Sequence, residues 1–214
     1  MISDISLFSD LSEAEYEIVT SHAKIRTYPK NTIILNEGDE AASLFFITSG
    51  KVRIFLSNED GKEIILNELG PGEHFGELAL IDDAPRSASV MTVRETKLAL
   101  ISKADFRRVL ESHPGIAVNL ITSLTRRFRM LSENVKSLAL LDVYGRVAKI
   151  LLDMSVEQDG NRIIPERPTQ QEIANHIGAS REMVARILKD LEIGGYITIE
   201  RKTILIKENL PARY

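Results

Sequence analysis

The residues with the clearest chemical potential lie in one short segment, FGELALIDDAPRSASV, at residues 75–90. Gly76 and Glu77 stand near its start, and a proline later leads into Arg86 and Ser87 at the head of an apolar run. An arginine is rarely left inside a strand core unless something offsets its charge. Its planar guanidinium suits a phosphate better than an ammonium group does. The segment therefore predicts an anion site, and the structural alternative is an Arg86–Glu77 salt bridge without a ligand.

Glu77 lies among apolar residues and needs a hydrogen-bond donor, which a ligand hydroxyl could supply. Arg127, fifty residues further on in an expected long helix, could also pair with it. A nucleotide hydrolase that uses Glu77 is a poor interpretation, because no metal cluster or nucleophile–base pair accompanies this carboxylate.

A second segment with chemical potential, RPTQQEIANHIGASREMVARILKDLEIGGYI, covers residues 167–197. Thr169 is predicted to cap a helix, with Glu172 three residues on as its capping-box partner. Gly178 ends that helix, and Ser180 caps the next one. Two short helices joined by a tight glycine turn predict a helix-turn-helix, and the strands expected on either side of residues 201–202 would form the wing of a winged helix.

The second of these helices carries the residue types that read DNA. Arg181, Glu182 and Arg186 fall on the face opposite its apolar positions. Arginine can bind guanine through two hydrogen bonds, and glutamate can accept one from cytosine. Other polar residues are placed where they would contact phosphates: Thr169, Gln170, Gln171, Ser180 and Lys189.

The elements that must position these residues follow from the hydrophobic period. Helical spacing covers residues 4–23, and residues 24–102 then show short apolar runs between turn signals, which predicts an antiparallel sandwich or barrel. A short helix is expected at 104–110. A polar loop at 157–162 should separate the C-terminal segment.

Residues 116–152 contain no proline and one glycine, so a long helix is expected there, with a kink near residues 142–145. Its apolar stripe has near-heptad spacing, which favours a homodimer seam over packing on the chain's own barrel. The stripe consists of Ile116, Leu120, Leu124, Leu131, Leu138 and Leu141, with Val135 beside it.

Composition narrows the class of protein further. The 214 residues carry a net charge of -4, yet residues 161–214 hold nine Lys and Arg against seven Asp and Glu. A mildly basic tail on an acidic body fits DNA contact by the tail. The absence of cysteine excludes disulfides and thiolate metal sites, and the four histidines have no metal-ligand spacing. No apolar run is long enough to span a bilayer, so a cytoplasmic protein is expected.

Together these parts resemble the CRP/FNR family of transcription factors, in particular its cyclic-nucleotide-responsive branch. The resemblance covers essentially the whole chain and is most specific in FGEL…PRSAS, LDVYGRVAKILL and QEIANHIGASREMVARIL. It implies an α+β fold: a double-stranded β-helix (jelly-roll) nucleotide-binding domain at 1–113, a long dimerisation helix at 114–141 and a winged helix-turn-helix at 142–214. It also implies a homodimer through residues 116–141, an inverted-repeat promoter site in double-stranded DNA, and contact with RNA polymerase.

The resemblance assigns roles within the first segment. Arg86 would pair with the cyclic phosphate and Ser87 would donate to it, while Glu77 would accept from the ribose 2′-hydroxyl. Gly76 would let the backbone close over the sugar, with Leu78 beside it. No covalent cofactor is implied; the effector would be a cyclic nucleotide, with cyclic AMP as the first candidate.

The base-reading part of the pattern departs from the cyclic-AMP-binding members. Where they carry a Thr-Ser pair on the long helix, this chain has Leu131 and Ser132. Arg129, three residues before Ser132, could favour guanine. Cyclic GMP, cyclic-di-GMP and a ligand-independent regulator therefore stay open. In the predicted helix-turn-helix, called the reading head below, Met183 and Gln170 replace residues that often contact phosphate. These replacements should weaken nonspecific binding to DNA.

Overall fold

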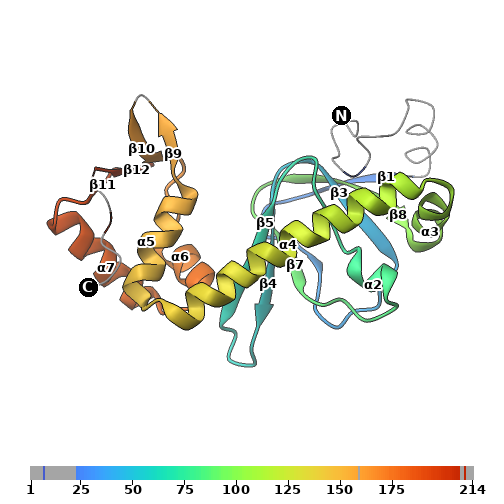
Figure 1. Cartoon of the computed structure of the whole chain (residues 1–214), viewed down its shortest axis with the longest axis horizontal. Coiled ribbons are helices and arrows are strands. Elements are labelled where there is room, and N and C mark those ends of the chain that lie inside the picture. Colours follow the sequence, from blue (N-terminus) through green and yellow to red (C-terminus); the bar gives the residue numbers. More distant parts are fainter. Residues whose placement is uncertain (1–6, 8–22, 159, 208–209, 211–214) are drawn as a thin grey trace. The chain divides into compact units, whose positions relative to one another are not determined.

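The computed structural model describes residue 7 and residues 23–158, 160–207 and 210 (Figure 1). The chain forms two compact units, one made of residues 1–56 and 65–130 and the other of residues 57–64 and 131–214. The helix expected at 4–23 falls, apart from Leu7 and Ala23, outside the described residues.

The first unit is built on two four-stranded sheets with antiparallel pairings. One has the order β1 (Lys24–Tyr28), β8 (Thr96–Ser102), β3 (Ser43–Ser49) and β6 (His74–Phe75). The other has the order β2 (Ile33–Leu35), β7 (Ser89–Thr92), β4 (Val52–Ser57) and β5 (Glu63–Leu69). The predicted antiparallel sandwich is confirmed.

The run SLFFITS in β3 shows why the first sheet is apolar on both faces. Successive side chains of a strand point to opposite faces. Phe45 accordingly packs with Val52 and Val90 of the other sheet, inside the sandwich. Phe46 packs on the outer face with Phe106 and Ile116 from the helices that cover it. A strand buried on both faces reads as a continuous apolar run rather than an alternating one.

Among the described residues, three helices accompany these sheets: α2 (Leu78–Ile81), α3 (Lys103–Ser112) and α4 (Pro114–Leu140). Proline at the first position of α4 is favourable, because the amide hydrogen that it lacks would have no partner there. α4 runs on as one helix into the second unit. It ends before residue 142, so the expected kink is a break between two helices.

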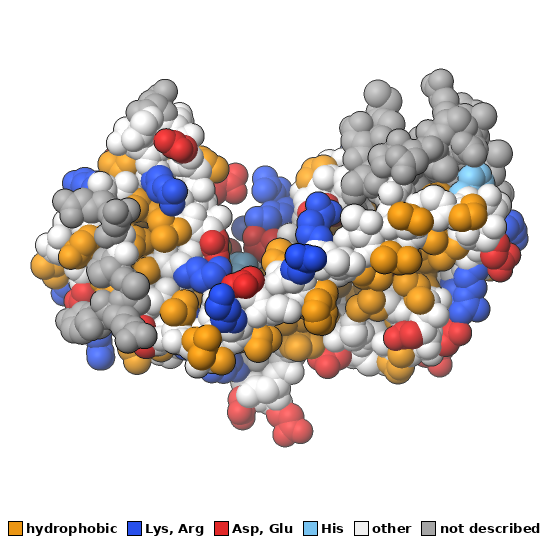
Figure 2. Space-filling model, in the orientation of Figure 1, with side chains coloured by type: hydrophobic (Ala, Val, Ile, Leu, Met, Phe, Trp, Pro, Cys, Tyr) orange, Lys and Arg blue, Asp and Glu red, His pale blue; other side chains and the backbone are white. Residues whose placement is uncertain are grey.

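The apolar stripe predicted along α4 is wrong in its first half. Ile116 and Leu120 are buried in their own domain's core, with Leu124 packed against the same cluster. The exposed apolar side chains of α4 include Val118, Ile121, Phe128 and Val135, at 61, 62, 71 and 64% exposure. They repeat at heptad spacing on another side of the helix, and hydrophobic side chains are visible on this face of the molecule in Figure 2.

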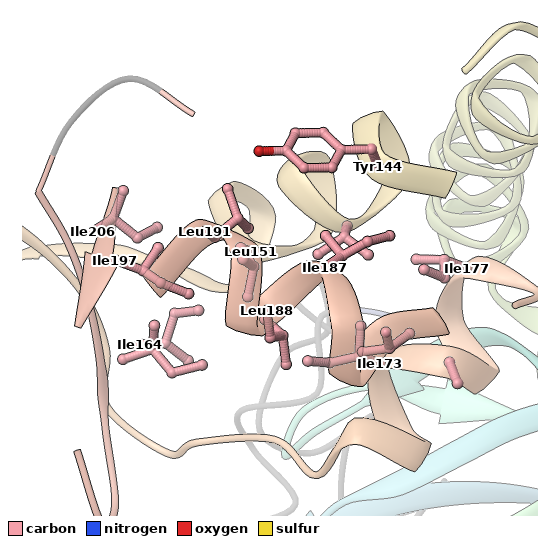
Figure 3. Packing of buried hydrophobic residues seen from close by; sticks show 14 residues of the cluster. Tyr144, Leu151, Ile164, Ile173, Ile177, Ile187, Leu188, Leu191, Ile197 and Ile206 are labelled. Carbon is pink, nitrogen blue, oxygen red and sulfur yellow. The ribbon is translucent and has the colours of Figure 1, made fainter. Parts of the chain in front are cut away.

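The second unit packs three helices against a small sheet. The helices are α5 (Val143–Met154), α6 (Gln170–Ile177) and α7 (Arg181–Ile193). The sheet has the order β11 (Ile197–Ile199), β12 (Ile204–Ile206), β10 (Asn161–Ile164) and β9 (Val156–Gln158). Leucine, isoleucine and valine from all three helices and from the sheet form one core (Figure 3).

The polar loop expected at 157–162 is wrong, because most of it forms the hairpin of β9 and β10. Asn161 pairs with Gln158, and Arg162 pairs with Ile206 across the sheet. The predicted wing is confirmed as β11 and β12. The exposed strand residues of β9 carry no apolar periodicity, so sequence patterning could not reveal that they pair.

Candidate functional site

The turn between β6 and α2 has room only for a glycine. Gly76 has a φ of +86°, in the region that side-chain-bearing residues rarely adopt. A Cβ atom at this position would lie 2.7 Å from Nη1 of Arg86. Gly76 is therefore required both by its backbone conformation and by the close approach of the guanidinium.

Arg86 is a buried cation held by main-chain oxygens. It is 5% exposed, and its Nη1 and Nη2 donate to the carbonyl oxygens of Gly76 and Ser43 at 2.6 and 2.7 Å. Its Nε is buried without a hydrogen-bond partner among the described residues. Burial lowers the pKa of Arg86, and the charges of Glu77 and Asp39 oppose that shift. Such a cation lacks the hydrogen-bonded anion that would offset its desolvation.

The backbone of Arg86 is fixed on both sides. Its amide donates to the carbonyl of Asp39 at 2.9 Å, and its own carbonyl accepts from Gly38 at 2.8 Å. The guanidinium carbon lies 6.0 Å from the centre of the Phe45 ring. These contacts fix the position of Arg86. Ser43, which the sequence did not indicate, contributes only its backbone carbonyl.

Glu77 pairs with Arg127 of α4, which is one of the two arginine partners expected from the sequence; the other was Arg86. Its Oε1 accepts from Nη1 of Arg127 at 2.9 Å, and Nη2 of the same arginine donates to the carbonyl of His74 at 2.5 Å. The ion pair of Glu77 in the described part of the chain is with Arg127, while the guanidinium of Arg86 donates to main-chain carbonyls. Burial raises the pKa of Glu77, and Arg127 opposes that rise. The second carboxylate oxygen, Oε2, is buried without a partner in the described part of the chain.

His74, next to this pair, is a buried residue that the sequence did not single out. It is 1% exposed and lies beside Phe46, and neither ring nitrogen has a partner among the residues described. Burial, together with the charges of Arg127 and Arg126, lowers its pKa to about 3. A neutral imidazole here avoids placing a second cation against Arg127.

The structure thus brings together four of the predicted ligand residues, Gly76, Glu77, Arg86 and Arg127. The others lie outside this hydrogen-bonded group. They are all exposed: Leu78, Ser87, Arg129 and Ser132.

The reading head has the helix ends that the sequence predicted. Thr169 and Glu172 form the reciprocal capping box, with bonds of 3.1 and 2.6 Å. Gly178 ends α6 with a φ of +63°, and the hydroxyl of Ser180 accepts from the amide of Met183 at 3.2 Å. These bonds satisfy amides that the first turns leave without partners.

The exposed face of α7 carries the predicted DNA-reading groups. Its buried side consists of Val184, Ile187, Leu188 and Leu191. Arg181, Glu182, Arg186 and Lys189 are all exposed. At the start of α6, the side-chain amide of Gln171 donates to Asn175 at 2.7 Å, which holds it along the helix. The arrangement presents charged donors and acceptors on one side of a rigid helix, as base reading requires.

Two further properties of the described residues bear on function. No helix there is long and apolar enough to cross a membrane. No group of three or more metal-binding side chains lies together in the same residues.

Comparison with known proteins identifies both halves. The family described as the cyclic nucleotide-binding domain matches residues 25–113, and the Crp-like helix-turn-helix domain matches residues 145–209. The cAMP-activated global transcriptional regulator CRP of Salmonella typhimurium is 37% identical over 193 residues, covering 87% of this chain and 90% of that protein. The chain belongs to the CRP/FNR family.

Further members of the CRP/FNR family are similar over most of their length. A CRP-like cAMP-activated global transcriptional regulator from Mycobacterium tuberculosis is 32% identical over 213 residues, covering 98% of this chain and 95% of its own. The solved structure of the c-di-GMP responsive global regulator CLP of Xanthomonas campestris has a TM-score of 0.81 at 29% identity, covering 92% of this chain and all of that one.

Membership of the CRP/FNR family confirms the predicted fold class and places the chain among transcription regulators rather than enzymes. It has a cyclic-nucleotide-binding domain and a DNA-binding helix-turn-helix domain.

Proposed function

We propose that this chain is a homodimeric transcription regulator whose binding to an inverted-repeat promoter site is controlled by a cyclic nucleotide held at Arg86. The observation that carries the proposal is two buried polar atoms without hydrogen-bond partners among the described residues, Nε of Arg86 and Oε2 of Glu77. A cyclic phosphate would supply the anion for Arg86, and a ribose hydroxyl would supply the donor for Glu77.

Within this proposal, each pocket residue has one task. Arg86 binds the phosphate through its guanidinium, and the exposed Ser87 donates its hydroxyl to the same group. Gly76 allows the backbone to approach the sugar, and Leu78 covers it. Arg127 connects the carboxylate that reads the sugar to α4. Ligand binding can therefore act on the helix that both halves of the protein share.

The base of the nucleotide is the open choice. Cyclic AMP is the first candidate, since the curated relatives at 32 and 37% identity are cAMP-activated. Cyclic-di-GMP is the second, because the regulator CLP responds to it. Leu131, which cannot hydrogen-bond a base, and Arg129, which could favour guanine, keep the guanine nucleotides in consideration.

Dimerisation and DNA binding would use two exposed surfaces, one on α4 and one on α7. Val118, Ile121, Phe128 and Val135 form the seam of a two-helix dimer, within the predicted range of residues 116–141. Arg181, Glu182 and Arg186 read base edges, and phosphates are contacted by Thr169, Gln170, Gln171, Ser180 and Lys189.

A dimer on a promoter in the cytoplasm would recruit or block RNA polymerase. The domains are then residues 1–113, 114–141 and 142–214.

Calorimetric titration of the full chain with cyclic AMP, cyclic GMP and cyclic-di-GMP tests the proposal. We expect one of them to bind, and Arg86→Ala to weaken it by roughly 100-fold, because two charge-assisted hydrogen bonds of about 1.5 kcal/mol each are lost. Arg86→Lys should recover little, since lysine lacks the planar fork. Arg26→Ala, an exposed arginine of β1, is the matched control and should bind normally.

Two results would contradict the proposal. Binding that survives Arg86→Ala would move the ligand away from this pocket. Absence of binding by all three nucleotides, with unchanged operator affinity in their presence, would make the ligand-independent regulator the correct description.

A further inference from the structure

The loop that leads from α2 to Arg86 contains a residue in an unfavourable conformation. Asp83 has a φ of +58°, and Asn31 is the other non-glycine residue with positive φ in the described part of the chain. Aspartate tolerates this region better than most residues but still loses free energy there. A conformation of this kind persists when surrounding contacts hold it, so these contacts are informative.

Asp83 is bound by two cations of α3. Its Oδ2 accepts from Nη2 of Arg107 at 2.7 Å, and its Oδ1 accepts from the same nitrogen at 2.9 Å and from Nζ of Lys103. The same Arg107 nitrogen also lies 3.4 Å from the carbonyl of Leu80, near the end of α2. Hydrogen bonds from Lys103 and Arg107 lower the pKa of Asp83. Arg107 therefore joins both α2 and the following loop to α3, and the Asp83 carboxylate joins the loop to α3.

The other end of this loop is fixed independently. The amide and carbonyl of Arg86 bond to Asp39 and Gly38 of the turn after β2. The segment from Leu78 to Pro85 is thus held at one end by backbone bonds and near its middle by the ion pairs of Asp83. Within the loop itself, Asp82 accepts from the amide of Ala84 at 3.1 Å, which is a local turn.

We propose that Asp83, together with Lys103 and Arg107, is a positioning residue of the ligand pocket. Its ion pairs hold the loop in the conformation that presents Arg86 and Ser87, and they join that loop to α3. Because His113 alone separates α3 from α4, the loop is tied to the α3–α4 helix pair. The part that concerns ligand binding rests on the proposed function; the part that concerns loop order does not.

The exposure of these ion pairs gives the inference a distinctive signature. The side chains of Asp83, Lys103 and Arg107 are 58, 31 and 47% exposed, whereas those of Glu77 and Arg127 are 4 and 17% exposed. Exposed pairs are screened strongly by salt and buried pairs much less. Order in the loop should therefore depend on ionic strength, while the Glu77–Arg127 pair should not.

Hydrogen exchange of the ligand-free full chain tests the positioning role directly. The amides of Leu80, Ile81, Asp82 and Arg86 are hydrogen-bonded, so peptides covering residues 78–88 have protection to lose. Asp83→Asn should speed their exchange about fivefold at low salt, the size expected of a small ion-pair network. The difference from wild type should shrink toward zero at roughly 1 M salt, where the wild-type pairs are screened.

Four variants separate the ion pairs from other effects. Asp83→Gly removes both the carboxylate and the backbone strain, and should also speed exchange. Arg107→Gln leaves the Lys103–Asp83 bond in place, so it should speed exchange no more than Asp83→Asn does. The double variant should exchange about as fast as Asp83→Asn alone, because the Arg107–Asp83 contact is already lost in that variant. Asp153→Asn, which breaks the exposed Lys149–Asp153 pair of α5 at 2.6 Å, is the matched control and should leave residues 78–88 unchanged.

The ligand arm uses whichever of the three nucleotides binds in the calorimetric titration. Asp83→Asn should weaken its binding about fivefold at low salt, with less effect at high salt. If exchange at residues 78–88 is the same in Asp83→Asn as in wild type, the positioning role is overturned, whatever binds. If no nucleotide binds but exchange rises as expected, the proposed function fails and the positioning role stands.

Discussion

The proposed ligand site around Arg86 and Glu77, called the pocket below, and the helix-turn-helix hold their charged groups in opposite ways. In the pocket, Glu77 and Arg86 are 3 and 5% exposed, and each keeps one buried polar atom without a partner among the described residues. In the reading head, Arg181 and Arg186 are exposed, and the helices beneath them are fully capped.

This difference separates two ways of preparing for a ligand. A buried charge that lacks a partner is destabilising until a ligand supplies one, so binding and stability are coupled in the pocket. An exposed charge is solvated before DNA arrives, so it contributes to recognition with little effect on folding. Substitutions of charged residues in the pocket should therefore change the free energy of unfolding, whereas substitutions in the reading head should leave it nearly unchanged.

The largest effect should come from Arg127→Ala in the pocket. It leaves the buried Glu77 without its cation, and we expect the free energy of unfolding to fall by roughly 3 kcal/mol. Urea denaturation at pH 7 would measure it. Glu77→Gln combined with Arg127→Met should lose much less, because the carboxylate that Arg127 neutralises is removed together with it. A loss under about 1 kcal/mol in Arg127→Ala would show that the pair is effectively solvated and would break the comparison.

The reading head should show the reverse behaviour. Arg186→Ala is expected to cost roughly 1–3 kcal/mol in operator binding and to relax base preference, because a bidentate guanine contact is lost. Lys189→Ala should instead weaken operator and scrambled DNA alike and reduce the slope of affinity against salt by about one. Both should unfold within about 0.5 kcal/mol of wild type. Fluorescence anisotropy with both DNA sequences gives the affinities, and a large loss of stability in either variant would contradict the comparison.

The smallest effect concerns His74 and sharpens the part played by burial. Its pKa is about 3 in the folded chain against an ordinary 6.5, so below pH 6.5 the unfolded state binds a proton that the folded state does not. The titration of His74 should therefore leave the free energy of unfolding unchanged above pH 6.5. Between pH 6.5 and about pH 3 it should lower that free energy by about 1.4 kcal/mol for each pH unit.

His74→Phe tests that expectation, since phenylalanine keeps an aromatic ring beside Phe46 without a titrating group. Unfolding free energies of wild type and variant would be compared at pH 7.5 and 5.5. The wild type should lose about 1.4 kcal/mol more than the variant between these two values. Equal losses would mean that His74 is hydrated in the folded protein.

Local chemistry accounts for what could be predicted in the reading head. Thr169 with Glu172, Gly178 and Ser180 mark helix ends through contacts that span four residues or fewer, so their spacing in the chain is enough to find them. The same holds for Gly76, whose turn and neighbouring glutamate carried the family pattern. The order of elements follows for the same reason, since the hydrophobic period is a local property.

Long-range packing decided the rest. The period of α4 predicts a stripe, but only the sheet beneath it decides that Ile116 and Leu120 face inward and Val118 and Ile121 outward. Residues 157–158 and 161–162 of the polar stretch form strands because β10 pairs with β9 and also with β12, about forty residues further on.

For the charged groups, residue types and spacing identify which side chains could form ion pairs, whereas tertiary packing decides which of them meet. Glu77 had two possible cations at distances of nine and fifty residues, and folding brought Arg127 to its carboxylate while leaving Arg86 on main-chain carbonyls. His74 and Asp83 had no distinctive neighbours in the chain, because their partners come from other elements. Residue type and spacing carry local hydrogen bonding and amphipathicity, whereas burial and ion pairing depend on which distant surfaces meet.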